Sequence, residues 1–297
     1  MLPPFLKIDD QIRIISPSGC INPEYVDGAI KELTDWGLHV SEGKFARAKY
    51  GRFAGTTEQR IEDLQLAFDD PTVKAILCSR GGYGISQIID KIDFSNFIKF
   101  PKWLIGFSDI TILHNAITNN GVASLHSIMA KHLTERTSND EPVQQLKNIL
   151  FGELPTYSIL PHTLNKYGKS SGKLIGGNLS VLMGLRGSQF DLDYSNAILF
   201  IEDIDEKPYK IDRMIQNLRF SGVFSKLSGL IVGQFSDCEE DPEMKQSILE
   251  IISFAIKEYD FPVCFNFPAG HVEYNLPLIL GTNIQLDVNQ TEVRIQF

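Results

Sequence analysis

The chain has 297 residues, a formal net charge of -9 and a pI near 5.2. This charge excludes nucleic acid as a partner, because a protein that neutralises phosphates needs a basic surface. No apolar run approaches the roughly 20 residues that span a bilayer, and the N-terminus lacks a basic region followed by a long apolar run. We therefore expect a cytoplasmic protein with no signal peptide and no membrane partner.

The cysteines are scattered along the chain without the spacing of metal ligands. Three of the four stand in or beside apparent strands, so we expect buried thiols and no disulfides. We also expect no metal and no cofactor. The cysteines are Cys20, Cys78, Cys238 and Cys264.

Strand and helix patterns alternate through the first half of the chain, which is typical of a parallel sheet with crossover helices. We therefore expect an α/β fold class, with a flavodoxin- or Rossmann-like parallel-sheet domain over residues 1–160. One of its helices is expected to begin at Thr56, which forms a capping box with Gln59. The strands of this domain are expected at 12–15, 39–40, 73–78, 103–106 and 122–125.

Residues 152–171 are poor in pattern and rich in polar residues, glycine and proline, which is typical of a domain boundary. We expect residues 161–297 to form a second α/β domain with a β-rich end. Its clearest elements are an apolar strand over 197–201, a helix that begins near Pro208, and a terminal antiparallel hairpin after about Leu278.

A serine stands where the strand predicted over 103–106 gives way to a helical pattern. On such a turn Ser108 can be displayed as a nucleophile, with the positive end of the helix beneath it. Capping of the helix is the more frequent role of a serine at this place. The nucleophile-elbow pattern also has glycine where this chain has Ile110. From this segment alone, capping is favoured.

A glycine cluster, residues 79–84, follows the strand predicted over 73–78. Gly81 and Gly82 can leave backbone N–H groups bare for a phosphate or an oxyanion, and a plain tight turn is an equal alternative. The cluster has neither the dinucleotide fingerprint nor the P-loop pattern. It ends a strand beside the one that precedes Ser108, at the carboxyl edge where open α/β sheets bind ligands.

A serine nucleophile needs a base and a carboxylate that orients the base. Of the six histidines, His271 ends a Pro-Ala-Gly turn that leaves its imidazole exposed. His126 is either a cleft residue or a core histidine, and the remaining four have no motif in their favour. Glu202 is the first polar residue after the apolar strand 197–201, so it is the candidate orienting group.

Taken together, these segments resemble the LD-carboxypeptidases, a family that includes the muramoyltetrapeptide carboxypeptidases and the microcin-immunity serine peptidases. The resemblance covers nearly the whole chain in the family's order. One departure is His126-Ser127-Ile128-Met129, where the family usually has His-Gly-Pro-Met. The matching segments are 16–18, 50–56, 80–84, 106–109, 176–179, 202–203, 212–213, 233–235, 270–271 and 275–281.

The resemblance implies a two-domain serine peptidase that removes a terminal D-amino acid from an L-centre. In the main branch of the family, the enzyme releases D-alanine from the muropeptide tetrapeptide in the cytoplasm, as part of peptidoglycan recycling, and is often a homodimer. The implied triad is Ser108, Glu202 and His271, and the implied oxyanion hole consists of the N–H groups of Gly82 and Asp109. The implied substrate-binding residues are Arg80, Gly81, Tyr83 and Phe53.

Two other functions stay open. A microcin-immunity peptidase would hydrolyse a peptidyl or aminoacyl nucleotide with the same triad. A non-catalytic ligand-binding homologue would hold an anion on the glycine cluster, and Ser108 would only cap its helix.

Overall fold

The computed structural model describes residues 1–239 and 241–297, and its contacts divide the chain into two units. Unit 1 is Met1–Leu154 with Glu273–Leu280, and unit 2 is Pro155–Val272 with Gly281–Phe297. The sequence-based division at 160/161 lies close to the first of these boundaries, but it placed 273–280 in the second domain. No helix of the described residues is long and apolar enough to cross a bilayer.

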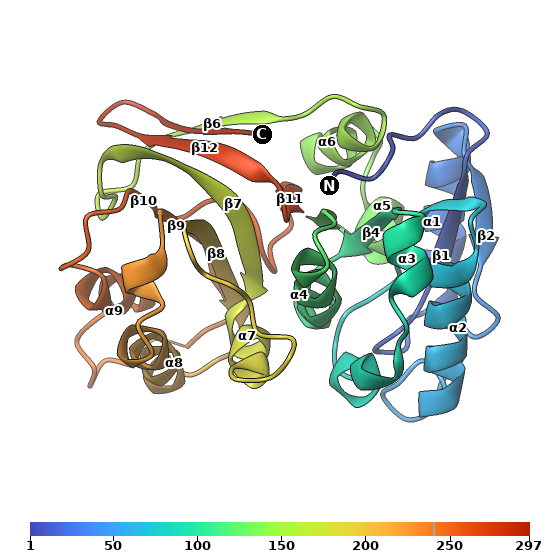
Figure 1. The fold of residues 1–297 in the computed structure, drawn as a ribbon, viewed down its shortest axis with the longest axis horizontal. Coiled ribbons are helices and arrows are strands. Elements are labelled where there is room, and N and C mark those ends of the chain that lie inside the picture. The colour runs from blue at the N-terminus through green and yellow to red at the C-terminus, as the bar shows by residue number, and fades with distance from the viewer. Residues whose placement is uncertain (240) are drawn as a thin grey trace. The chain divides into compact units, whose positions relative to one another are not determined.

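Unit 1 is built on a sheet with the strand order β11-β5-β4-β3-β1-β2 among the described residues. Strands β1 to β5 run parallel, as the sequence predicts, and β11 pairs antiparallel with β5. The crossover helices lie around these strands (Figure 1). The strands are β1 (Gln11–Ile15), β2 (His39–Glu42), β3 (Val73–Cys78), β4 (Trp103–Gly106), β5 (Ser124–His126) and β11 (Leu278–Leu280).

The sequence predicted a helix that begins at Thr56 and a helical pattern after Ser108, and both helices are present. The first of them begins with the predicted capping box of Thr56 and Gln59. After the glycine cluster, two short 3-10 turns, Ile85–Gln87 and Ile89–Lys91, take the place of a regular helix. The α-helices are α1 (Pro23–Asp35), α2 (Thr57–Asp69), α3 (Ser95–Lys99), α4 (Thr111–Asn119), α5 (Ala130–Glu135) and α6 (Glu141–Leu150).

Unit 2 contains a mixed sheet with the order β10-β9-β8-β7-β12-β13-β6 in the part of the chain that is described. Strands β7 to β10 are parallel, and β12, β13 and β6 are antiparallel, which confirms the α/β domain with a β-rich end. The strands are β6 (Thr156–Ile159), β7 (Gly168–Asn178), β8 (Ala197–Ile204), β9 (Gly229–Ser236), β10 (Val263–Cys264), β12 (Asn283–Val288) and β13 (Val293–Gln296).

The helices of unit 2 are α7 (Leu179–Leu185), α8 (Pro208–Phe220) and α9 (Ile248–Ala255) among the described residues, and they lie along one side of the sheet (Figure 1). The core beneath them includes Ala197, Leu199 and Ile201 of β8. Because successive strand residues point to opposite faces, Glu202 points away from this core. The alternation of β8 therefore places a carboxylate on the sheet face that the helices leave uncovered.

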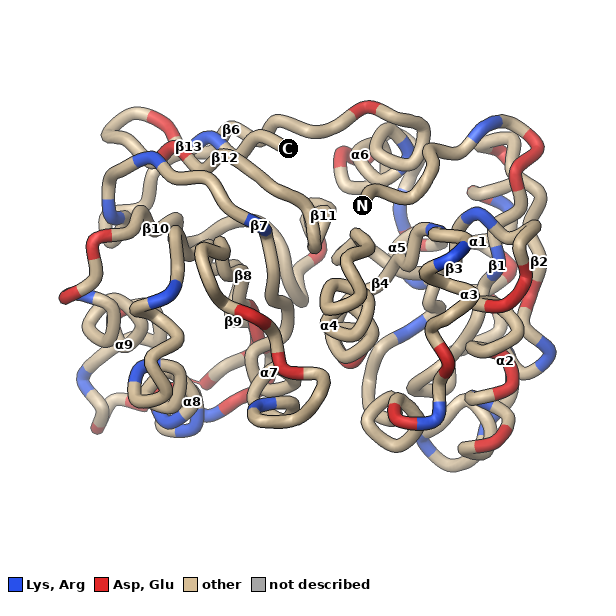
Figure 2. The backbone as a smooth tube through the Cα atoms, viewed as in Figure 1, with Lys and Arg blue, Asp and Glu red and all other residues tan. Residues whose placement is uncertain are grey.

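Charged side chains are distributed over both units. Lys and Arg segments are interspersed with Asp and Glu segments and do not gather in one stripe (Figure 2).

Gly176 allows β7 to approach β8 closely. A Cβ at this position would lie 1.9 Å from the carbonyl oxygen of Phe200, and the φ of +123° is one that other residues rarely adopt. We expect Gly176→Ala to lower the free energy of unfolding by about 2–4 kcal/mol. The control is Gly184→Ala in α7, where a Cβ meets no atom within 4 Å; it should raise that free energy by about 0.5–1 kcal/mol. Equal urea midpoints for the two variants would contradict this packing.

Candidate active site

Ser108 follows β4 in a strained conformation. Its φ is 68°, a region that non-glycine residues rarely occupy. The 3-10 turn that it begins, Ser108–Ile110, has no side-chain cap hydrogen bond, and the N-cap position of α4 is occupied by Ile110. The capping role that the segment alone favours is therefore not the one the structure shows. Strain of this kind clusters at functional sites and is a feature of nucleophile elbows.

The side chain of the next residue, Asp109, holds three loops together. Its Oδ2 accepts a hydrogen bond from Ser18 Oγ at 2.6 Å and another from the backbone N–H of Ile85 at 3.0 Å. Burial raises the pKa of Asp109, whereas the hydrogen bond from Ser18 acts in the opposite direction. The sequence pointed only to the backbone N–H of Asp109, so this role of its carboxylate was missed.

The glycine cluster lies directly against the serine turn. A Cβ at Gly81 would be 2.7 Å from Ser108 Cβ and 3.0 Å from Ser108 Oγ, so only glycine fits there without displacing the serine. The neighbouring Gly82 is exposed and has a φ of +106°. The prediction that these two turns meet at one edge of the sheet is confirmed.

A buried arginine supports the glycine cluster from α2. Arg60 is 1% exposed, and its Nη1 donates to the carbonyl oxygens of Gly84 at 2.8 Å and Pro17 at 3.3 Å. Its guanidinium carbon lies 4.8 Å from the centroid of the Phe53 ring. Burial lowers the pKa of Arg60, and the charge of Asp109 opposes that shift. An arginine in a helical pattern is usually a solvated charge, so the sequence alone does not predict this buried position.

The candidate substrate-binding side chains surround the same cluster. The rings of Phe53 and Tyr83 lie 6.0 Å apart between centroids. Arg80 donates from Nη1 to the carbonyl oxygen of Cys20 at 2.8 Å. Unit 1 therefore brings together all of the predicted substrate-binding residues with Ser108, Gly82 and Asp109.

Unit 2 joins the predicted base to the predicted carboxylate. His271 Nδ1 lies 2.7 Å from Glu202 Oε2, and the Glu202 side chain is fully buried while that of His271 is 14% exposed. Burial acts to lower the pKa of His271, but the hydrogen bond and charge of Glu202 outweigh it, so the pKa is raised above its usual value. In the tautomer in which Nδ1 donates to Glu202, Nε2 is the ring nitrogen that can accept a proton.

Two glycines make room for this carboxylate. A Cβ at Gly270 would lie 2.9 Å from Glu202 Oε2, and a Cβ at Gly233 would lie 3.2 Å from Glu202 Cβ. The sequence placed Glu202 just after its strand; in the structure β8 continues to Ile204, so Glu202 lies within the strand. A carboxylate held by a strand on both sides has little freedom, which fixes the ring of His271.

A second acid in β8 connects the strands of unit 2. Asp203 is 1% exposed and accepts hydrogen bonds from Asn178 Nδ2 at 2.9 Å and from the N–H of Ser180 at 2.8 Å. Burial, followed by the nearby charge of Glu202, raises the pKa of Asp203 to about 6. The sequence included Asp203 in the matching segment 202–203 but assigned it no role, because a buried carboxylate has no pattern of its own.

The two fully buried histidines of unit 1, His114 and His126, are structural, whereas His39 is exposed. His114 lies beneath the serine turn, with Nε2 at 2.8 Å from the carbonyl oxygen of Gly106 and Nδ1 at 2.8 Å from Ser124 Oγ. Burial lowers the pKa of His114 to about 4, and it also lowers that of His132 to about 4. His126 is fully buried, which fits the core interpretation better than the cleft interpretation.

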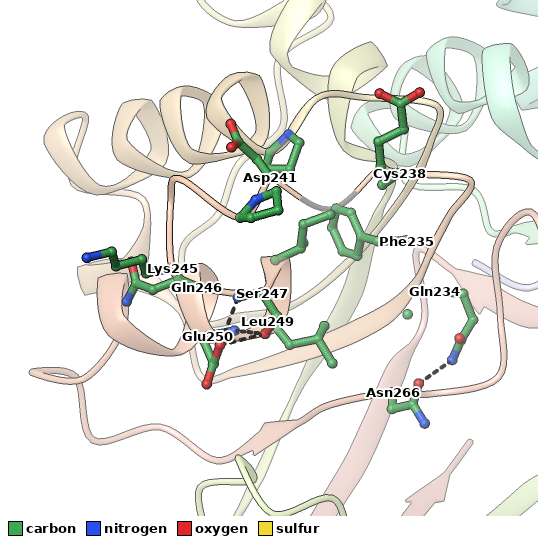
Figure 3. Close-up of a pocket in the computed structure, with 15 residues that line it drawn as sticks. Gln234, Phe235, Cys238, Asp241, Lys245, Gln246, Ser247, Leu249, Glu250 and Asn266 are labelled. Atoms are coloured by element: carbon green, nitrogen blue, oxygen red, sulfur yellow. Dashed lines mark hydrogen bonds between the residues drawn. The ribbon is translucent and has the colours of Figure 1, made fainter.

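A pocket of about 490 Å³ lies in unit 2 beside the loop that carries His271. Figure 3 shows Gln234 and Asn266 on one wall, where Gln234 Nε2 donates to Asn266 Oδ1 at 2.9 Å. The backbone N–H of Gln234 donates to the carbonyl oxygen of Ala269 at 3.0 Å. The wall of this pocket and the histidine loop are thus fastened to each other.

Comparison with known proteins gives matches along the chain. An LD-carboxypeptidase N-terminal domain matches residues 12–127, and an LD-carboxypeptidase C-terminal domain matches residues 171–286. The "Probable murein peptide carboxypeptidase" of Bacillus subtilis is 33% identical, over 99% of this chain and 94% of the relative. The "Murein tetrapeptide carboxypeptidase" of Pseudomonas aeruginosa is 30% identical, over 95% of each.

Solved structures show the same fold. The muramoyltetrapeptide carboxypeptidase from Oxalobacter formigenes has a TM-score of 0.88 at 26% identity, over 96% of this chain and 97% of that one. The microcin self-immunity protein MccF, in complex with aspartyl sulfamoyl adenosine, has a TM-score of 0.88 at 22% identity, over 100% and 98% of the two chains, which is a likeness of fold alone. From the domain matches and from relatives aligned over nearly their whole length, the chain belongs to the LD-carboxypeptidase family.

Proposed function

We propose that this chain is a cytoplasmic serine LD-carboxypeptidase that releases the terminal D-alanine of the muropeptide tetrapeptide. The observation that carries the proposal is the hydrogen bond between His271 and the buried Glu202 at 2.7 Å. The same chain has one serine with a positive φ among the described residues, Ser108, and it lies against the glycine cluster. The relatives named for murein peptides support the substrate class. As in much of the family, the working form is a homodimer.

In the proposed mechanism, Ser108 Oγ attacks the carbonyl carbon of the L,D-peptide bond while His271 Nε2 accepts its proton. Glu202 stabilises the imidazolium that forms. The N–H groups of Gly82 and Asp109 donate to the tetrahedral oxyanion. His271 then gives the proton to the departing amine of D-alanine, and water hydrolyses the acyl-enzyme with His271 again as base.

Removal of the nucleophile tests the proposal directly. Ser108→Ala should reduce D-alanine release from the tetrapeptide by at least about 10,000-fold, because the acyl-enzyme has no oxygen on which to form. Free D-alanine is measured with D-amino acid oxidase, and the melting temperature reports whether the fold is kept. Undiminished release would remove Ser108 from the mechanism. Wild-type hydrolysis of an aminoacyl nucleotide in preference to the tetrapeptide would place the chain in the microcin-immunity branch instead.

The Glu202–His271 pair predicts a pH dependence. Despite its burial, His271 has a pKa raised above its usual value by the hydrogen bond and charge of Glu202, so the imidazole is protonated below that raised pKa, and kcat/KM falls as the pH decreases through it. Glu202→Gln removes the charge that raises the pKa, so this limb should move to lower pH, and kcat should fall by about 100- to 10,000-fold. Glu258→Gln, an exposed acid of the same unit, is the control and should leave the profile unchanged. An unshifted limb in Glu202→Gln would show that another group titrates.

The contact between Gly81 and Ser108 gives a third test. Gly81→Ala places a methyl group 2.7 Å from Ser108 Cβ, so the serine must move. We expect kcat to fall by about 100-fold, because a displacement of that kind misaligns the attacking oxygen. The rate at which a fluorophosphonate labels Ser108 should fall with it. A variant with normal kcat and normal labelling would mean that the glycine cluster does not support the nucleophile.

A further inference from the structure

A small hollow in unit 1 opens beside the glycine cluster. Its volume is about 310 Å³, and it includes Gly82, whose N–H belongs to the proposed oxyanion hole. The adjacent Gly81 is the residue that contacts Ser108. The hollow is lined by Gly19, Cys20, Arg52, Arg80, Gly82 and Tyr83.

Two arginines, Arg52 and Arg80, line this hollow. Across residues 1–239 and 241–297, no ion pair joins Arg52 or Arg80 to an acid. Arg13 and Arg47 of unit 1 differ: Arg13 pairs with Asp70 at 2.8 Å, and Arg47 pairs with two acids at 2.6 and 2.7 Å. The positive charge of the hollow is therefore available to a ligand.

The hollow is held in place by hydrogen bonds between its loops. Gly19 N–H donates to the carbonyl oxygen of Gly81 at 3.0 Å, and Cys20 N–H donates to that of Arg52 at 3.0 Å. Arg80 Nη1 donates to the carbonyl oxygen of Cys20, which leaves its remaining N–H groups for a ligand. Loops fixed in this way lower the entropy cost of ordering the site when a ligand binds.

The position of the hollow matches the geometry of a carboxypeptidase substrate. When the scissile carbonyl oxygen lies at the N–H of Gly82, only the nitrogen and the Cα of the last residue separate that carbonyl from the terminal carboxylate. A group that recognises the carboxylate must therefore lie next to the oxyanion hole. Guanidinium groups bind carboxylates through parallel charge-assisted hydrogen bonds.

We propose that Arg80 and Arg52 bind the C-terminal carboxylate of the substrate, and that this contact restricts cleavage to the last peptide bond. The inference rests on the proposed function, because it uses the oxyanion hole assigned there. Arg80 is the fixed member of the pair, since its guanidinium is already held by Cys20. Arg52 reaches the ligand from the opposite loop.

The test compares the tetrapeptide with the same peptide ending in D-alaninamide. In Arg80→Ala and Arg52→Ala, kcat/KM for the free carboxylate should fall by about 10- to 100-fold, mostly through KM. The carboxamide, which the wild-type enzyme should cleave poorly, should be cleaved by the variants at nearly the wild-type rate. Arg80→Lys should restore part of the preference. The control is Arg47→Ala. Arg47 lies in the same loop as Arg52 but already forms ion pairs with two acids, so this variant should keep the wild-type preference for the free carboxylate.

Equal losses on both peptides would show that the arginines only support the loops, and would overturn the proposal. So would a wild-type enzyme that does not distinguish the two peptides. Calorimetry on the Ser108→Ala variant separates this inference from the proposed function, because it measures binding without catalysis. N-acetyl-D-alanine should bind, and its amide should not. Adding Arg80→Ala to Ser108→Ala should abolish this difference between the two ligands. If that binding is seen while wild-type protein releases no D-alanine, the proposed function fails and the carboxylate site stands. If no arginine-dependent binding is seen, the site is rejected.

Discussion

The buried carboxylate of Asp109 is the interaction on which the arrangement of unit 1 depends. Its Oδ2 accepts one hydrogen bond from the hydroxyl of Ser18, in the loop after β1, and another from the N–H of Ile85, just after the glycine cluster. Asp109 itself directly follows Ser108. Desolvation of such a group is costly unless its hydrogen bonds are made. The two donors offset that cost only when all three loops are in place. The same contacts therefore fix the strained serine, the bare N–H groups and the hollow beside them.

Unit 2 uses the same principle with two adjacent acids. Asp203 ties the end of β7 to β8 through Asn178 and Ser180, while Glu202 on the other face of the strand holds the ring of His271. Because neighbouring strand residues point in opposite directions, Asp203 and Glu202 lie on opposite faces of β8. Asp203 has a structural role, and Glu202 binds the imidazole. Their proximity contributes to the raised pKa of Asp203. The histidine is thus oriented by the part of the chain that is least able to move.

Much of this could be predicted from the sequence. Regular alternation predicted the parallel sheet of unit 1, and the Thr56 capping box predicted the start of α2. The strand-end positions of Ser108 and the glycine cluster predicted their meeting. Strand β6 and residues 168–171 of β7 were predicted to be part of a linker, because the first half of β7 is polar and alternates between partly and fully exposed positions. The roles of Arg60, Asp109 and Asp203 could not be predicted, because they depend on burial that only the tertiary fold creates.

Strand β11 has a consequence for how the protein is made. It is formed by Leu278–Leu280, yet it completes the sheet of unit 1 by pairing with β5. During translation, the first 154 residues leave the ribosome before β11 has been made. The edge of β5 therefore stays unpaired until nearly all of the 297 residues have been synthesised. Unpaired edges promote association with other chains. The sheet of unit 1 is therefore completed only when the segment that follows the first part of unit 2 in the chain has been synthesised.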